Sequence, residues 1–195
     1  MAIEHEIEFK QLLDQNTYET IKTHYFKQQR PFKQVNFYID TPDLQIQSQK
    51  MALRIRKKAD STHELTLKVP DTVGLLEYHA TCHIQPEAAM AIPQSLLSSE
   101  IRDQLKMRHV SLDALQVLGA LTTYRLELQM DEGLLVLDHS QYLGTEDYEL
   151  EFEVHDFETG QQAFHELLAQ HHLSPNVPKN KVQRFFDYQQ SKPHG

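Results

Sequence analysis

Apolar and charged residues alternate along most of this 195-residue chain. The first example is the segment EIEFK near its start. On a β-strand, side chains at every second position share one face. Ile7 and Phe9 would then form an apolar face, and the opposite face would carry Glu6, Glu8 and Lys10. The pattern predicts a strand with one face on a hydrophobic core and one charged face.

The same alternation predicts seven further strands, at residues 35–40, 51–57, 64–69, 75–84, 123–130, 134–138 and 148–155. Apolar residues repeat with helical spacing elsewhere. These stretches predict helices at 14–26, at one or two places within 86–117, at 159–173 and at 181–190. No internal repeat or linker interrupts the series. We therefore expect a single domain over residues 1–190, followed by a short C-terminal tail at 191–195.

Two α+β arrangements satisfy this pattern. In the first, helices cover the apolar face of an open sheet and the charged face lies in water. In the second, about eight strands close into a barrel, so that the charged face lines the inside. The triplet Glu149, Glu151 and Glu153 places like charges on one strand face, where they repel unless a counter-charge or ligand offsets them. This crowding favours the closed barrel, although the pattern alone leaves both arrangements open.

Composition excludes several classes of protein. The net charge of −9 argues against non-specific binding of nucleic acid. No apolar run approaches the roughly 20 residues that cross a bilayer, so we expect no membrane partner. Cys82 is the only cysteine, which excludes an internal disulfide, and no apolar signal segment follows the first residue. We therefore predict a cytoplasmic protein. Its twelve histidines lack a compact ligand spacing, and we assign them to surface or core positions.

Nine short segments, taken in order, resemble the CYTH domain, also called the triphosphate tunnel metalloenzyme superfamily, and in particular its small single-domain bacterial members. No one segment is specific, but the ordered set spans nearly the whole chain. The segments are EIEFK (6–10), NFYIDTPD (36–43), ALRIRK (52–57), LTLKVP (65–70), GLLEY (74–78), TYRLEL (123–128), LD (137–138), ELEFE (149–153) and KNKVQRF (179–185).

The resemblance implies an eight-stranded antiparallel β-barrel that forms a charged tunnel, with amphipathic helices packed on the outside. Such a tunnel domain would bind a triphosphate together with a divalent cation. Basic side chains suit phosphate oxygens, and arginine adds a planar two-pronged donor. We predict that the substrate-binding residues are Arg54, Arg56, Lys68, Arg125, Lys181, Lys179 and Arg184.

Carboxylates cannot bind phosphate directly, so the acidic residues imply an intervening Mg²⁺ or Mn²⁺, which prefers hard oxygen ligands. The predicted metal ligands are Glu6, Glu8, Asp138, Glu149, Glu151 and Glu153. Lys10 and Lys68 are the predicted catalytic residues. For each of these residues the alternative role is a structural ion pair between neighbouring strands.

The predicted function is metal-dependent hydrolysis of inorganic triphosphate or of a small organic or nucleoside triphosphate. One alternative is a non-catalytic regulatory module that binds nucleotides or polyphosphate in the same tunnel. The retained glutamates favour catalysis, because a pure phosphate binder could lose them. A second alternative, adenylate cyclase, ranks lower because no motif for an adenosine pocket is present. The family pattern predicts that the substrate carries a triphosphate, but it does not identify the group attached to that triphosphate.

Overall fold

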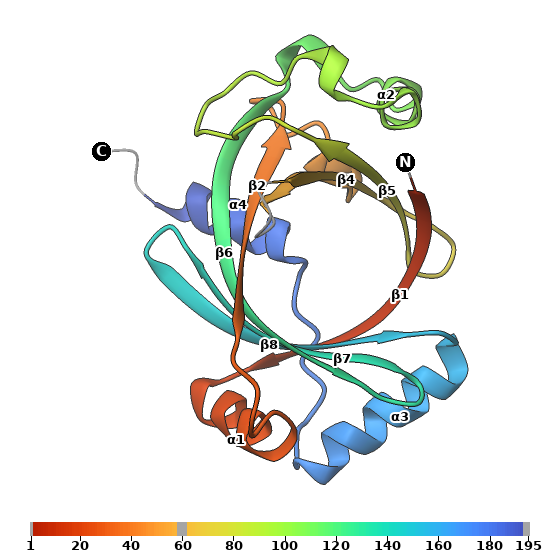
Figure 1. Cartoon of the computed structure of the whole chain (residues 1–195), viewed down its shortest axis with the longest axis vertical. Helices are drawn as coiled ribbons and strands as arrows, with labels where there is room; N and C mark the ends of the chain where they lie inside the picture. Colours follow the sequence, from red (N-terminus) through yellow and green to blue (C-terminus); the bar gives the residue numbers. More distant parts are fainter. Residues whose placement is uncertain (1, 58–61, 193–195) are drawn as a thin grey trace. The chain divides into compact units, whose positions relative to one another are not determined.

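Eight strands form one closed antiparallel sheet in the computed structural model, which describes residues 2–57 and 62–192 (Figure 1). The order around the sheet is β1–β5–β4–β3–β2–β6–β7–β8. The strands are β1 Ala2–Leu13, β2 Phe32–Asp40, β3 Ala52–Lys57, β4 His63–Pro70, β5 Leu75–Cys82, β6 Gln116–Gln129, β7 Gly133–Tyr142 and β8 Thr145–Val154. The predicted closed barrel is confirmed, and the open sheet is excluded.

The helices are α1 Gln15–Tyr25, α2 Ser99–Met107, α3 Phe157–Gln170 and α4 Lys181–Ser191, with short 3₁₀ helices η1 Gln47–Gln49, η2 Gln94–Leu96 and η3 Leu112–Ala114. Three of the α-helices begin after a residue whose side chain accepts a hydrogen bond from a backbone N–H of the first turn, namely Asp14, Ser98 and Asp156. None of the helices in the described residues combines the length and apolar character needed to cross a membrane.

Most elements differ from their expected boundaries by a few residues, whereas the number of α-helices within 86–117 agrees with the expectation. The stretch 86–117 holds one α-helix, α2, and β6 already begins at Gln116 rather than at 123. At the C-terminus, α4 extends to Ser191, and residues 193–195 of the predicted tail lie outside the described residues.

The chain divides into two compact units. The first comprises the described residues of 1–5, 34–122 and 181–195, and the second comprises 6–33 and 123–180. In the first unit, α2 contributes Ile101 and Leu105 to a core formed with the apolar faces of β3 and β4, whose buried members include Leu53, Ile55, Leu65 and Leu67. Alternation along the strands therefore predicted the core side of this unit.

In the second unit, α1 and α3 pack against the apolar faces of β7 and β8. Figure 1 shows both helices on the same side of these two strands. The buried residues of this core include Ile21 of α1, Phe164 of α3, Leu135 of β7 and Phe152 of β8. Full burial of a side chain of this size stabilises a fold by roughly 1.5–3 kcal/mol, which keeps the helices on the apolar face.

In the first unit, α4 packs differently, because it covers a charged strand face. Phe185 and Phe186 are almost fully buried, and their ring centroids lie 5.7 and 6.5 Å from that of Tyr38. Tyr38 lies directly opposite Arg54, so it shares the face of this arginine. The Phe185 ring also lies against Gly119. A Cβ atom at this glycine would be 2.1 Å from Phe185 Cζ. Helices α1, α2 and α3 thus cover apolar faces, whereas α4 covers the arginine-bearing face of its unit.

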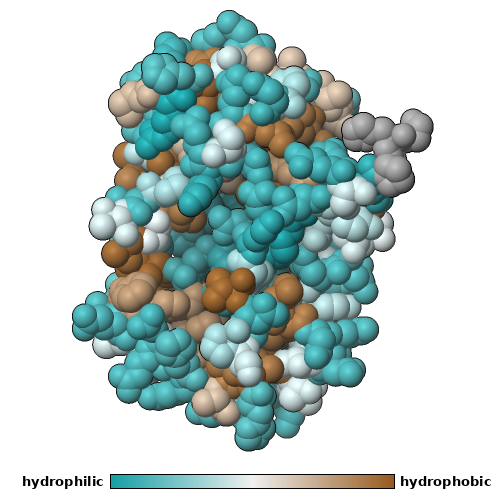
Figure 2. All heavy atoms as spheres, turned by 180° about the vertical axis from the view of Figure 1, so that it is seen from behind, coloured by the Kyte–Doolittle hydropathy of each residue, from teal (hydrophilic) through white to brown (hydrophobic). Residues whose placement is uncertain are grey.

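Hydrophilic side chains cover most of the molecular surface seen in Figure 2, with apolar patches between them. In the described part of the chain, the exposed large apolar side chains are Ile3, Phe32, Val73, Met107, Phe157 and Val177. These residues come from separate elements, as expected for single apolar residues on the surface of a globular domain.

Candidate functional site

In the second unit, the charged faces of β1 and β8 lie side by side. Their register places Glu8 directly opposite Glu153, and Lys10 directly opposite Glu151. Opposed side chains in an antiparallel pair point to the same face, so these four groups are neighbours. Glu6 lies two positions before Glu8 and continues this face by alternation.

Strand β7 extends the acidic surface of the second unit. Asp138 of β7 lies opposite Glu149 of β8, and both side chains are completely buried. The structure therefore brings together five of the six predicted metal ligands through strand register, and it places Glu6 beside them. We call these six residues the acidic cluster: Glu6, Glu8, Asp138, Glu149, Glu151 and Glu153.

Two cations lie within the acidic cluster. Lys10 Nζ is 2.7 Å from Glu8 Oε1 and 3.9 Å from Glu151 Oε1. Arg125 of β6 donates from Nε and Nη2 to the two oxygens of Asp138, at 2.9 and 2.6 Å, and from Nη2 to Glu151 Oε2 at 2.8 Å. Glu151 therefore bridges the two cations. The predicted role of Lys10 beside the glutamates is compatible with this geometry.

The structure places Arg125 differently from the other predicted phosphate-binding residues. Its side chain is buried, and its Nη1 atom lies 3.8 Å from Glu153 and 3.9 Å from Glu127. Burial alone would lower the pKa of Arg125, but Asp138 and Glu151 raise it well above its ordinary value. The guanidinium fork is directed at carboxylates, so in this geometry Arg125 orients the acidic cluster.

The acidic cluster becomes more accessible along β8, from Glu149 to Glu153. Asp138 is fully buried, the side chain of Glu151 is 5% exposed, that of Glu8 is 10% exposed and that of Glu153 is 32% exposed. Asp138 and Glu151 are bonded to Arg125, whereas Glu8 and Glu153 form the accessible edge. A ligand or ion that reaches the cluster would meet this edge first.

The donor chemistry of this edge fits Mg²⁺ or Mn²⁺. Two glutamates lie directly opposite each other, an arrangement of like charges that destabilises a sheet unless a cation offsets it. Carboxylate oxygens are also the ligands that these ions prefer. Within residues 2–57 and 62–192, no three His, Cys, Asp or Glu side chains already converge as a metal site. The fit therefore rests on the opposed Glu8–Glu153 pair and on the donor type.

In the first unit, four predicted phosphate-binding cations gather around Tyr38. Burial raises the pKa of this tyrosine, and the positive charges of the four cations oppose that rise. They are Arg54 and Arg56 of β3 together with Lys181 and Arg184 of α4. We call these four residues the basic cluster. Packing of α4 on the charged strand face brings its two cations to the two arginines.

The predicted phosphate-binding residues differ in their contacts. Arg56 donates from Nε to Asn36 Oδ1 at 3.0 Å, whereas Arg54 Nε is enclosed and has no hydrogen-bond partner in the described structure. Lys68 contacts its cross-strand partner Glu77. Lys179 is exposed in the segment before α4. The structure thus leaves this donor of Arg54 unsatisfied, while a carboxylate already contacts Lys68.

The sequence indicated no role for one residue of the charged face, His79. We assigned the histidines to surface or core positions, but His79 of β5 lies among carboxylates, 3.0 Å from Glu77 and 3.7 Å from both Glu64 and Glu4. Alternation placed it beside Glu77. Its other neighbours depend on strand pairing, which the pattern did not supply.

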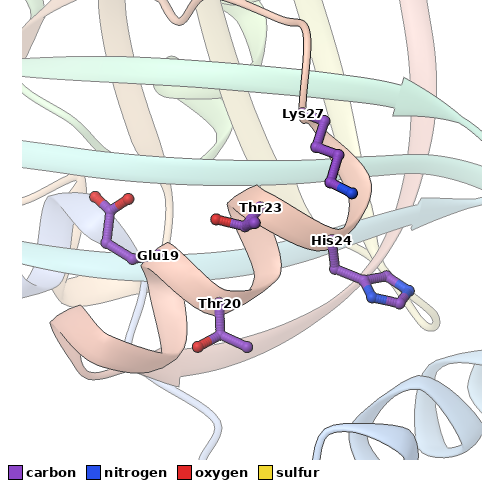
Figure 3. Close-up of a pocket in the computed structure, with 5 residues that line it drawn as sticks. All are labelled: Glu19, Thr20, Thr23, His24 and Lys27. Atoms are coloured by element: carbon purple, nitrogen blue, oxygen red, sulfur yellow. The ribbon is translucent and has the colours of Figure 1, made fainter.

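An open pocket beside α1 contains none of the predicted site residues. Figure 3 shows its lining, which comes from α1 and the turn that follows: Glu19, Thr20, Thr23, His24 and Lys27. This lining mixes one acidic and one basic side chain and lacks the concentration of charge found in the two clusters. We therefore place the candidate site in the clusters.

The closed antiparallel barrel and its charged strand faces define a class of protein, and comparison with known proteins identifies the family. The model of the CYTH domain family matches residues 4–186, so the chain belongs to this family.

Individual relatives agree with this family. YjbK of Bacillus subtilis (strain 168), which carries the provisional name of a triphosphatase, is 39% identical over 189 residues, covering 96% of this chain and 97% of YjbK. A crystal structure of the Bacillus halodurans protein bh2851, provisionally named an adenylate cyclase, is 34% identical and covers 95% of this chain and all of that one, with a TM-score of 0.81. The Hippeastrum protein HpAC1 shares the fold, at 22% identity, 96% coverage of both chains and a TM-score of 0.68.

Proposed function

We propose that this protein is a divalent-metal-dependent triphosphatase that hydrolyses a phosphoanhydride bond of inorganic triphosphate or of a small organic or nucleoside triphosphate. The observation that carries the proposal is the packing of α4, which bears Lys181 and Arg184, beside Tyr38 on the strand face that carries Arg54 and Arg56. The provisional name of YjbK, 39% identical along almost its whole length, supports the same reaction class.

The basic cluster supplies the groups that bind phosphate oxygens. A triphosphate carries several negative charges, and charge-assisted hydrogen bonds from arginine are among the stronger polar contacts in proteins. Arg54 has an enclosed Nε without a hydrogen-bond partner, and an unsatisfied buried donor of this kind favours an anion bound beside its guanidinium. Lys181 and Arg184 add charge from α4.

The accessible edge of the acidic cluster supplies the cation ligands. We assign Glu8 and Glu153 as the principal ligands, with Glu6 beside them, because they combine the opposed register with the greater exposure. Asp138, Glu149 and Glu151 lie deeper and add negative charge around these ligands. A divalent cation bound there would offset charge on the transferred phosphate and lower the pKa of a water molecule.

Lys10 and Arg125 hold the acidic cluster in place. Lys10 donates to Glu8 and lies beside Glu151, so it offsets part of the repulsion between these carboxylates. Its ammonium group is also positioned to donate to an attacking water or to a phosphate oxygen near Glu8. Arg125 fixes Asp138 and Glu151 through three hydrogen bonds.

A phosphate-release assay on purified protein tests this proposal. The substrates are inorganic triphosphate, ATP, GTP and thiamine triphosphate, each with Mg²⁺, with Mn²⁺ and with chelator. We expect release from at least one substrate with metal and none with chelator. Metal-dependent binding of a triphosphate without any release would instead identify a regulatory module.

Adenylate cyclase is the second candidate, because the 34% identical protein bh2851 carries that provisional name. The two reactions differ in products. Hydrolysis of ATP at a phosphoanhydride bond yields phosphate or pyrophosphate with a linear nucleotide, whereas cyclisation yields pyrophosphate and cyclic AMP. Chromatography of the ATP reaction separates these outcomes, and cyclic AMP as the main nucleotide product would replace the triphosphatase proposal.

A further inference from the structure

His79 occupies a central position on the charged face of the first unit. Strand register aligns Tyr38, Arg54, Thr66 and His79 in one row across β2, β3, β4 and β5. Only the small Thr66 therefore separates His79 from Arg54 along this row. The side chain of His79 is 16% exposed, which leaves its ring largely enclosed by its neighbours.

Both ring nitrogens of His79 face carboxylates. Nε2 lies 3.0 Å from Glu77 Oε2 and 3.7 Å from Glu4 Oε2. Nδ1 lies 3.7 Å from Glu64 Oε1 and 3.3 Å from the hydroxyl of Thr66. A neutral ring could donate from Nε2 to Glu77 and accept at Nδ1 from Thr66, but only an imidazolium also attracts the Glu64 carboxylate at Nδ1. The geometry therefore suits the protonated ring.

The pKa of His79 agrees with this geometry. The carboxylates of Glu64 and Glu77 raise it to about 9, and partial burial opposes the rise. The charged groups that face the ring are Glu4 of β1, Glu64 of β4 and Glu77 of β5, while Lys68 of β4 contacts Glu77. The negative charge of Glu64 and Glu77 outweighs the Lys68 ammonium, which favours the protonated ring at neutral pH.

Glu77 connects His79 to Lys68. Its Oε1 atom contacts Lys68 Nζ and its Oε2 atom contacts His79 Nε2, and only 8% of its side chain is exposed. A carboxylate with so little access to water depends on these protein partners. If the charge on His79 were lost, Glu77 would interact more strongly with the Lys68 ammonium. The charge state of His79 thus determines how tightly Glu77 holds Lys68.

We propose that His79 is a positioning residue for Lys68: the imidazolium shares the Glu77 carboxylate, and this sharing leaves the Lys68 ammonium able to bind phosphate. The inference rests on the proposed triphosphatase function and deepens it. Loss of the His79 charge, by substitution or at alkaline pH, shifts Glu77 towards Lys68 and weakens substrate binding.

The test compares four proteins with inorganic triphosphate and Mg²⁺: the wild type, His79→Gln, Glu77→Gln and the double variant. Glutamine can still donate to Glu77 but carries no charge. We expect His79→Gln to lower kcat/KM about tenfold at pH 7, mainly through KM. In the Glu77→Gln background the same change should have almost no effect, because the carboxylate through which His79 acts is gone. His165→Gln, at an exposed position on α3, controls for loss of a histidine.

The pH profile separates positioning from a general structural role. Wild-type kcat/KM should fall on an alkaline limb near pH 9, and this limb should be absent from His79→Gln. Thermal unfolding of each variant checks the fold. The inference would be overturned if His79→Gln lowered kcat/KM equally in the wild-type and Glu77→Gln backgrounds, or if His79→Gln kept the alkaline limb of the wild type. The triphosphatase proposal would stand in either case. A wild type that neither hydrolyses nor binds any triphosphate would overturn both.

Discussion

The buried guanidinium of Arg125 offers a quantitative test of how the acidic cluster is held together. Arg125→Gln removes two hydrogen bonds to Asp138 and one to Glu151, and it leaves both carboxylates buried. Removing one partner of a buried ion pair costs about 3–5 kcal/mol, because the remaining charge is left uncompensated. We expect a loss of this size in the free energy of unfolding. It is a large share of the roughly 5–15 kcal/mol that stabilises a typical domain.

Urea denaturation at pH 7 measures this loss, with Arg30→Gln, at an exposed position, as the matched control. Combining Arg125→Gln with Asp138→Asn should cost less than the sum of the two single changes, by about 2 kcal/mol. A deficit below about 1 kcal/mol, equal to that of Arg30→Gln, would refute the reasoning from burial.

Three further predictions concern α4, His79 and the basic cluster. Gly119→Ala should lower the free energy of unfolding by about 1–3 kcal/mol, because the new Cβ would meet the Phe185 ring. The double variant Gly119→Ala, Phe185→Leu should lose less unfolding free energy than the sum of the two single variants. The pKa of His79 is raised from 6.5 to about 9, so its contribution to stability is complete below about pH 6.5 and is lost as the pH rises through 9. Chemical denaturation between pH 6 and 10 should show this decline in the wild type and a flatter curve in His79→Gln. Arg54→Met should weaken the binding of triphosphate about tenfold, measured by calorimetry in the presence of chelator, with little change in melting temperature. An unchanged affinity would show that Arg54 does not bind phosphate.

Alternation along the strands was enough to predict which residues share a face. It placed Arg54 with Arg56, and Glu8 with Lys10, before any pairing was known. The family resemblance then specified a closed barrel, which the strand order confirms. The start of β6 escaped the prediction because residues 117–121 are nearly all apolar or small, and such a run does not distinguish a strand from a helix.

Register and helix placement could not be predicted from the pattern. The position of Arg125 among Asp138 and Glu151 depends on which strands are neighbours, so sequence alone grouped it with the phosphate-binding residues. The apolar stripe of α4 indicates a packed helix, but it does not show that Phe185 covers the arginine-bearing face. Glu64, which raises the pKa of His79 together with Glu77, lies on the neighbouring strand β4, and single-strand alternation does not reveal this contact.

The central claim is that Glu8 and Glu153 bind the divalent cation on which triphosphate hydrolysis depends. The most direct test measures phosphate release from the best substrate against Mg²⁺ concentration in the wild type, Glu8→Gln and Glu153→Gln, with the exposed Glu166→Gln as control. Each substitution relieves the repulsion between opposed carboxylates but also gives up a contact with Lys10 or Arg125, so the net change in stability should be small. We predict that both variants melt like the wild type yet lose at least about 100-fold in activity, while Glu166→Gln keeps it. Wild-type, metal-dependent turnover in both Glu8→Gln and Glu153→Gln would contradict the account.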